Sequence, residues 1–184
     1  SHPSLRRQRY LRRFQAWMRR LALWIVLCLI YPAPAVSETL RLASYTAALE
    51  RNAPGLLYRD IIHGKSAQIH AALRLIATIQ PDILALQRFD WDAELRAARA
   101  FQSALKAQGW EMPHVLAPRP NTGVASGVDI DGNGQIGGPS DAQSYGTFAG
   151  QRALLLLSRL PFDAQYSQDH SQILWADVPH TQST

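Results

Sequence analysis

The pattern of apolar and polar residues predicts four β-strands. Residues 40–44 alternate large apolar side chains with polar or small ones, which is the period of two that is typical of a strand. Residues 83–86 and 153–157 are nearly continuous apolar runs, as expected for strands that are covered on both faces. Residues 114–117 form a shorter candidate strand.

A helical period predicts a first helix between these strands, over residues 66–79. Three of its apolar residues recur at i, i+4 and i+7, and Ser66 is placed to cap its N-terminus. These apolar residues are Ile69, Leu73 and Ile76. Residues 47–65, which precede it, are expected to be irregular because they contain the breakers Pro54, Gly55 and Gly64.

A second helix is predicted between Asp92, which can cap it, and Gly109, which stands where a C′ glycine belongs. Its apolar stripe consists of Leu95, Ala98, Phe101 and Leu105. The resulting order of strand, helix, strand, helix, strand, strand predicts a layered α/β fold.

The predicted elements are few for a two-layer domain. Residues 121–150 are rich in Gly, Ser, Asp and Asn and indicate a long loop. An open sheet of this size would keep a long unpaired edge and an uncovered face. We therefore interpret residues 38–184 as the N-terminal part of a larger domain, the alternative being a complete small domain.

Residues 1–37 have the three parts of a secretory signal peptide. A basic stretch is followed by the apolar residues 21–31 and then by small residues suited to a signal peptidase. The apolar run is shorter than the roughly 20 residues that a spanning helix needs. An uncleaved membrane anchor and a buried N-terminal helix are the alternatives. We expect an exported protein, periplasmic or extracellular, with contact to a membrane only through this segment.

The charge of the chain is concentrated in this leader. The net charge is +5, from 19 basic and 14 acidic residues, and the leader holds seven arginines and no acid. The remaining chain carries about two more acidic than basic residues, so the high isoelectric point is no evidence for a nucleic-acid-binding surface. The single cysteine, Cys28, also lies in the leader, so a cleaved chain would be stable without disulfides.

Several segments, in order, resemble the endonuclease/exonuclease/phosphatase superfamily, especially its secreted bacterial members. They are residues 42–46 (LASYT), 81–90 (PDILALQRFD), 121–123 (NTG), 150–161 (GQRALLLLSRLP) and 173–179 (ILWADVP). The resemblance implies a deoxyribonuclease-like four-layer α/β sandwich, of which this chain would supply the N-terminal half. It also implies cleavage of phosphate-ester substrates with Mg²⁺ or Mn²⁺.

The chain departs from this family at its two metal positions. Thr46 stands where the family has an Asn at the end of the first strand, and Arg88 stands where it has a Glu. A guanidinium only donates hydrogen bonds and stays charged, so Arg88 cannot bind a cation. The family's later acidic and histidine positions would fall beyond Thr184. We therefore predict that this polypeptide is inactive, although the resemblance implies a hydrolase lineage.

A second motif indicates calcium without reference to the family. Residues 129–135 match D-x-D-x-N-G, the first half of a Ca²⁺ loop. The candidate ligands are Asp129, Asp131, Asn133 and Gln135, while position 12 of the loop is Ser140 rather than Glu. The alternative is a turn loop with solvated carboxylates. This motif motivates a second hypothesis, a non-catalytic, Ca²⁺-stabilised secreted binding protein on the same scaffold.

Other candidate residues have plainer interpretations. The histidines lack the spacing of metal ligands, and His70 is expected on a helix surface. Asp90 and Asp92 could replace the lost ligand by a local shift, but Asp92 fits a helix cap. The tryptophans Trp91, Trp110 and Trp175 are expected to anchor the core and loops.

Overall fold

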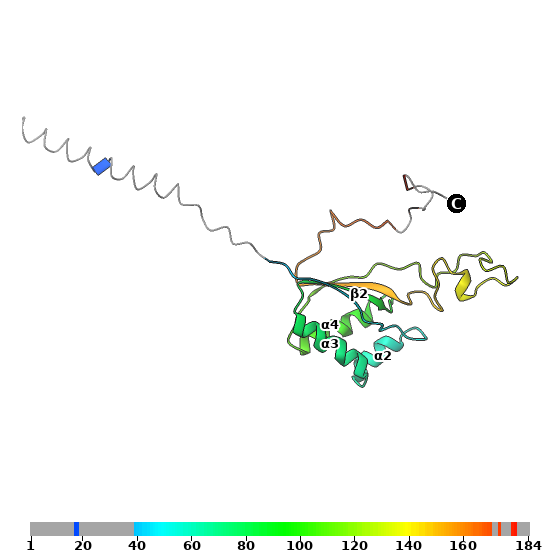
Figure 1. Ribbon diagram of the computed structural model, residues 1–184, viewed down its shortest axis with the longest axis horizontal. Helices are drawn as coiled ribbons and strands as arrows, with labels where there is room; N and C mark the ends of the chain where they lie inside the picture. The colour runs from blue at the N-terminus through cyan, green and yellow to red at the C-terminus, as the bar shows by residue number, and fades with distance from the viewer. Residues whose placement is uncertain (1–16, 19–38, 171–172, 174–177, 180–184) are drawn as a thin grey trace, which may run out of the picture. The chain divides into compact units, whose positions relative to one another are not determined.

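The computed structural model describes residues 17–18, 39–170, 173 and 178–179 of the chain (Figure 1). The chain divides into two units, residues 1–39 and 40–184, and the first contains only three described residues. The predicted leader features, including the apolar run 21–31 and Cys28, lie outside the described residues. Among those described, no helix is long and apolar enough to cross a membrane.

The described residues between 40 and 184 form a mixed α/β unit around one four-stranded sheet. The strands are β1 (Leu42–Thr46), β2 (Ile83–Phe89), β3 (His114–Leu116) and β4 (Ala153–Ser158). Their order in the sheet is β1-β2-β4-β3, with β1 and β2 parallel and the other pairs antiparallel. The predicted α/β class and the four strands are therefore confirmed, with bounds shifted by one to three residues.

Three helices pack on one face of this sheet: α2 (Leu56–His63), α3 (Ala67–Ile79) and α4 (Arg96–Ala107) (Figure 1). The core between the layers includes the inward residues Leu84 and Leu86 of β2. At its centre, Phe101 of α4 is fully buried. Its ring meets that of Phe89 edge to face, with centroids 5.7 Å apart.

Ser66 caps α3 as predicted, whereas α4 begins at Arg96 with Leu95 at the N-cap position, and Asp92 caps its first turn from three residues further upstream. The Ser66 hydroxyl accepts a hydrogen bond from the Ile69 amide at the start of α3. At the start of α4, the Asp92 carboxylate accepts from the amides of Arg96 and Ala97, at 2.9 and 3.0 Å. These carboxylate contacts satisfy amides of the first turn and oppose the helix dipole.

The expectation of an irregular segment over residues 47–65 is wrong, because it contains helix α2. Leu57 and Ile61 are one helical turn apart and both enter the core. Gly55 and Gly64, interpreted as breakers, instead bound the helix in left-handed conformations. The Gly64 amide donates to the carbonyls of Asp60 and Ile61, which ends the helix as a C-terminal glycine does.

The opposite face of the sheet is apolar and open among the described residues. Leu42 is 71% exposed and Leu154 is 41% exposed, although both lie in strands. Ile83, Ala85 and Leu156 on the same face are only partly buried. The central strands are therefore covered on one face only, contrary to the expectation from their apolar runs.

The predicted long loop joins β3 to β4. It contains one short 3-10 helix, η1 (Pro139–Asp141), and two isolated β-bridges, Thr122 with Ser144 and Ala125 with Ala142. The expected strand-like segment 173–179 lies largely outside the described residues, which include only positions 173, 178 and 179 of it.

Candidate functional site

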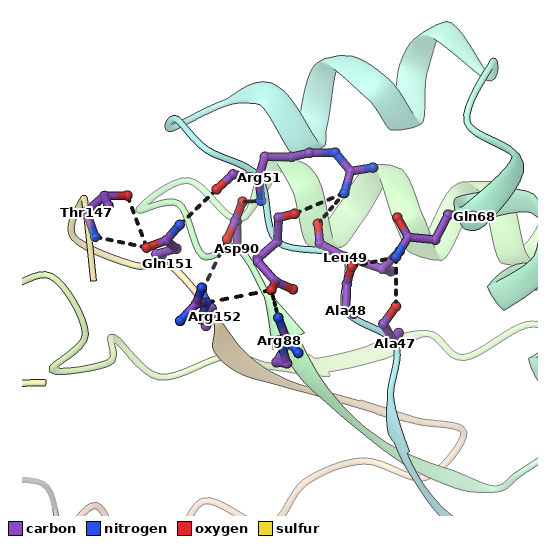
Figure 2. A network of polar contacts seen from close by, with 11 residues as sticks. Ala47, Ala48, Leu49, Arg51, Gln68, Arg88, Asp90, Thr147, Gln151 and Arg152 are labelled. Atoms are coloured by element: carbon purple, nitrogen blue, oxygen red, sulfur yellow. Dashed lines mark hydrogen bonds and ion pairs between the residues drawn. The ribbon is translucent and has the colours of Figure 1, made fainter. Parts of the chain in front are cut away.

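Three segments meet at one end of the sheet and bring polar side chains together (Figure 2). The carboxyl ends of the parallel strands β1 and β2 share this edge, and the antiparallel strand β4 begins there. The residues come from segments 46–51, 87–90 and 147–152. This edge contains both metal positions that the resemblance implies, Thr46 and Arg88.

Arg88 occupies a β-bulge near the end of β2. The pairing of β2 with β4 passes from Gln87 to Phe89, so Arg88 is left out of the ladder. Its φ of 59° is left-handed, a conformation that costs a non-glycine residue roughly 1–3 kcal/mol. The Arg88 carbonyl accepts from the Leu49 amide at 2.9 Å, which ties the bulge to the turn after β1.

Thr46 lies on the neighbouring strand, in register with Gln87. Its hydroxyl donates to the Gln87 amide oxygen at 3.1 Å, and the Gln87 amide nitrogen donates to the Ser44 hydroxyl at 2.8 Å. Thr46 therefore lies across from Gln87, the residue that precedes Arg88 on the neighbouring strand. The hydroxyl of Thr46 is hydrogen-bonded to the neutral side chain of Gln87.

Glu50 is an acidic residue at this edge that the sequence did not single out. Its side chain is only 12% exposed, and its Oε1 atom forms ion pairs with both Arg88 and Arg152. The Arg152 Nε atom lies 3.6 Å from that oxygen. The Oε2 atom is buried and has no hydrogen-bond partner among the described residues. One carboxylate oxygen thus faces two guanidiniums.

This arrangement does not fit the Mg²⁺ or Mn²⁺ ion that the resemblance implies. Hard cations bind oxygen ligands, preferably carboxylates. The position that the resemblance assigns to a glutamate holds a guanidinium. Of the two nearby carboxylates, Glu50 is already paired with two arginines, and both oxygens of Asp90 already accept backbone amides. A cation there would lie against positive charge, which opposes binding.

Asp90 is a buried residue that connects two of these segments through hydrogen bonds to their backbones. Its carboxyl is 5% exposed and accepts from the backbone amides of Arg51, at 2.7 Å, and Arg152, at 3.2 Å. Burial raises the pKa of Asp90, and the two amides oppose that rise. Asp90 therefore joins the turn after β1 to the start of β4.

Arg51 and Gln151 stiffen the same edge (Figure 2). The Arg51 guanidinium donates to Asp60 at 2.7 Å and to the Leu49 carbonyl at 3.0 Å. The Gln151 amide nitrogen donates to the Arg51 carbonyl at 3.0 Å, and its oxygen accepts from the amide and hydroxyl of Thr147. These hydrogen bonds fix the backbone segments that carry Glu50 and Arg152.

The predicted calcium motif forms a compact turn in the long loop. Asp129 accepts from the amides of Asn133 and Gly134, and Asn133 accepts from the amide of Gln135. Carboxylate oxygens of Asp129, Asp131 and Asp141 all lie within 4.8 Å of one another. No other group of three or more such ligands occurs among the residues that the structure describes.

Asp141 is the structural centre of this loop. Its side chain is buried, with 1% exposure, and its two oxygens accept from the amides of four residues. These donors are Ile130, Asp131, Gly137 and Gly138. The bond from the Ile130 amide, aided by the others, lowers the pKa of Asp141 and outweighs burial. These amides hold the Asp141 carboxylate beside those of Asp129 and Asp131, so the structure adds Asp141 to the predicted candidate ligands of residues 129–135.

The pKa of Asp141 predicts how the loop responds to acid. The pKa of Asp141 in the folded protein lies below its ordinary value of 3.8. This carboxylate therefore stabilises the loop at any pH above 3.8, and the stabilisation is lost as the pH falls through the folded pKa. In an NMR titration, the amides of Ile130, Gly137 and Gly138 should shift with a midpoint below 3.8. Asp141→Asn should abolish that transition and lower the melting temperature, whereas Asp163→Asn on an exposed turn should do neither. A midpoint above 3.8 would contradict the assignment.

The remaining candidates are structural. The His70 Nε2 atom lies 2.8 Å from the Gly64 carbonyl, to which it donates. The indoles of Trp91 and Trp110 donate to the carbonyls of Ala117 and Pro81, each at 3.0 Å. Trp175 and His180 lie outside the described residues.

Comparison of the chain with protein-family models gives no match. Searches of curated proteins and of solved structures also give none. The resemblance to the phosphoesterase superfamily therefore depends on the residues quoted above, and the site is interpreted from its own geometry.

Proposed function

We propose that this chain is a non-hydrolytic member of the endonuclease/exonuclease/phosphatase lineage. The observation that carries the proposal is the ion pair between Arg88 and Glu50 at the strand ends where the family holds its catalytic metal. With a guanidinium in this place, no divalent ion is held and no metal-bound water is activated.

The open face of the sheet supports the finer fold assignment. In the four-layer sandwich that the resemblance implies, a second sheet covers the face that here exposes Leu42 and Leu154. We propose that this face packs against such a sheet, because large apolar side chains in strands are seldom left in water. We also propose that residues 1–37 direct the protein out of the cytoplasm.

A hydrolysis assay tests the proposed loss of activity. We expect the full chain with millimolar Mg²⁺ or Mn²⁺ to hydrolyse neither bis-p-nitrophenyl phosphate nor plasmid DNA above the buffer rate. Leu84→Asp places a charge at a position that is 1% exposed and gives an unfolded control for contaminating enzymes. Turnover that EDTA abolishes and that is absent from this control would show that the chain is an enzyme.

A second candidate function is a calcium-stabilised binding protein. The specific observation in its favour is the turn in which Asp129 and Asn133 accept amide bonds while carboxylate oxygens of the loop converge. The ligands would come from the side chains of Asp129, Asp131, Asn133 and Asp141 and from an oxygen of Gln135.

Calcium titration tests this candidate. At a Ca²⁺ concentration ten times the dissociation constant, binding to the folded state should add about 1.4 kcal/mol of stability. We expect the melting temperature to rise with millimolar Ca²⁺ and the rise to vanish in Asp129→Asn with Asp131→Asn. Asp163→Asn, which removes an exposed carboxylate from another turn, should keep the full rise. No heat of binding and no thermal shift would remove the calcium function.

A further inference from the structure

Arg88 and Arg152 converge on one carboxylate from the ends of two neighbouring strands. Arg88 lies in the bulge of β2, and Arg152 immediately precedes β4. Both have left-handed backbones, with φ values of 59° and 58°. Such conformations persist where the surrounding structure enforces them, and they are frequent at binding sites. Here they aim two guanidiniums at the same Glu50 oxygen (Figure 2).

The two guanidiniums have more donors than the protein uses. Each carries five N–H groups, and among the described residues Glu50 is the only side-chain partner of either one. Their side chains are 46% and 44% exposed, so the remaining donors face solvent. The single Glu50 carboxylate cannot accept hydrogen bonds from all the N–H donors of two guanidiniums, and its one negative charge cannot neutralise both of their positive charges.

We propose that Arg88 and Arg152 form a metal-independent binding site for a tetrahedral oxyanion, a phosphate or sulfate group. Planar guanidinium forks suit the oxygen edges of such a group, and two forks can hold it from two sides. The site goes beyond the proposed function, because it requires neither hydrolysis nor relation to a phosphoesterase.

Glu50 acts in this site as the resident counter-ion. Its Oε1 atom occupies the guanidiniums when no ligand is bound, and its buried Oε2 atom has no partner among the described residues. An arriving oxyanion must compete with this carboxylate for the same donors. Glu50 therefore sets the affinity, and removing its charge should strengthen binding.

Calorimetric titration of the full chain in EDTA tests the site. The probes are inorganic phosphate, sulfate and dimethyl phosphate. Sulfate is a dianion, phosphate is a mixture of mono- and dianion near neutral pH, and dimethyl phosphate is a monoanion that stands for a diester. We expect Arg88→Gln and Arg152→Gln each to weaken phosphate binding by about tenfold or more, as loss of a charged hydrogen-bond donor does. Arg88→Lys should also weaken it, because lysine keeps the charge but lacks the fork. Glu50→Gln should tighten it.

The matched control is Arg96→Gln, which removes a guanidinium of similar exposure, 58%, from the acid-paired start of α4. The seven leader arginines are the same in all variants, so their contribution cancels in the comparison. Wild-type protein provides a test that needs no variant: the backbone amide signals of Arg88 and Arg152 should shift on phosphate addition. Unmoved signals, equal losses in Arg96→Gln, or binding that requires Mg²⁺ would each overturn the proposal. Binding of dimethyl phosphate as tight as phosphate would assign the site to diesters.

Discussion

Replacing Arg88 by glutamate is expected to create a divalent-cation site at this end of the sheet. The change removes a positive charge and adds a carboxylate beside Glu50, whose buried Oε2 atom has no partner among the described residues. With Arg88 gone, Glu50 also loses its closest ion pair. The carboxylate at position 88 of β2 and that of Glu50, in the turn after β1, would supply the oxygen ligands that Mn²⁺ and Mg²⁺ prefer. We expect a dissociation constant of about 10⁻⁴–10⁻³ M, typical of a simple carboxylate site.

Two control variants separate ligand chemistry from net charge. Arg88→Gln removes the guanidinium without adding a carboxylate, and Arg99→Glu makes the same change of charge on the exposed surface of α4. Neither should bind Mn²⁺ more tightly than wild type when free Mn²⁺ is followed by electron paramagnetic resonance. Adding Thr46→Asn to Arg88→Glu should strengthen binding, because an amide oxygen then joins the two carboxylates. If Arg88→Glu binds no better than Arg99→Glu, the strand edge is not a latent metal site.

Truncating Phe101 to alanine is expected to cost about 3–5 kcal/mol in the free energy of unfolding. The ring is fully buried between α4 and the sheet and meets Phe89 edge to face at 5.7 Å. Its removal loses both the transfer free energy of the ring and its packing contacts, since the helices and sheet cannot fully collapse into the space.

Urea unfolding followed by circular dichroism measures this cost. Leu75→Ala is the matched control on α3, because Leu75 is 43% exposed and should lose less than about 1 kcal/mol. Equal effects of the two changes would mean that α4 does not pack on the sheet as described, and the positions of the site residues would then be in doubt.

The helices that could be predicted from the sequence are those in which apolar residues recur at the helical period without interruption. Helices α3 and α4 were recognisable because their buried residues recur every three or four positions between identifiable caps. Helix α2 was not recognised, because it spans only eight residues, Leu56–His63, and glycines lie at both ends. The same glycine signal marks an interruption in one context and a helix cap in another.

The candidate site was predictable only in part. Thr46 and Arg88 follow apolar strand residues, so their closeness could be expected from a parallel pair of strands. Glu50 and Arg152 could not be found in this way, because they lie in turns far apart in the sequence, and no periodicity links them. The central role of Asp141 was also missed, since its four amide bonds depend on how the loop folds back.

Anomalous diffraction from wild-type crystals soaked in Mn²⁺ would test the central claim, that a guanidinium has displaced the metal from this strand edge. The account predicts no anomalous peak beside Thr46, Glu50 and Arg88, whatever is bound at the Asp129 loop. A Mn²⁺ ion at ordinary ligand distance, about 2.1 Å, from the Thr46 hydroxyl or the Glu50 carboxylate would contradict it.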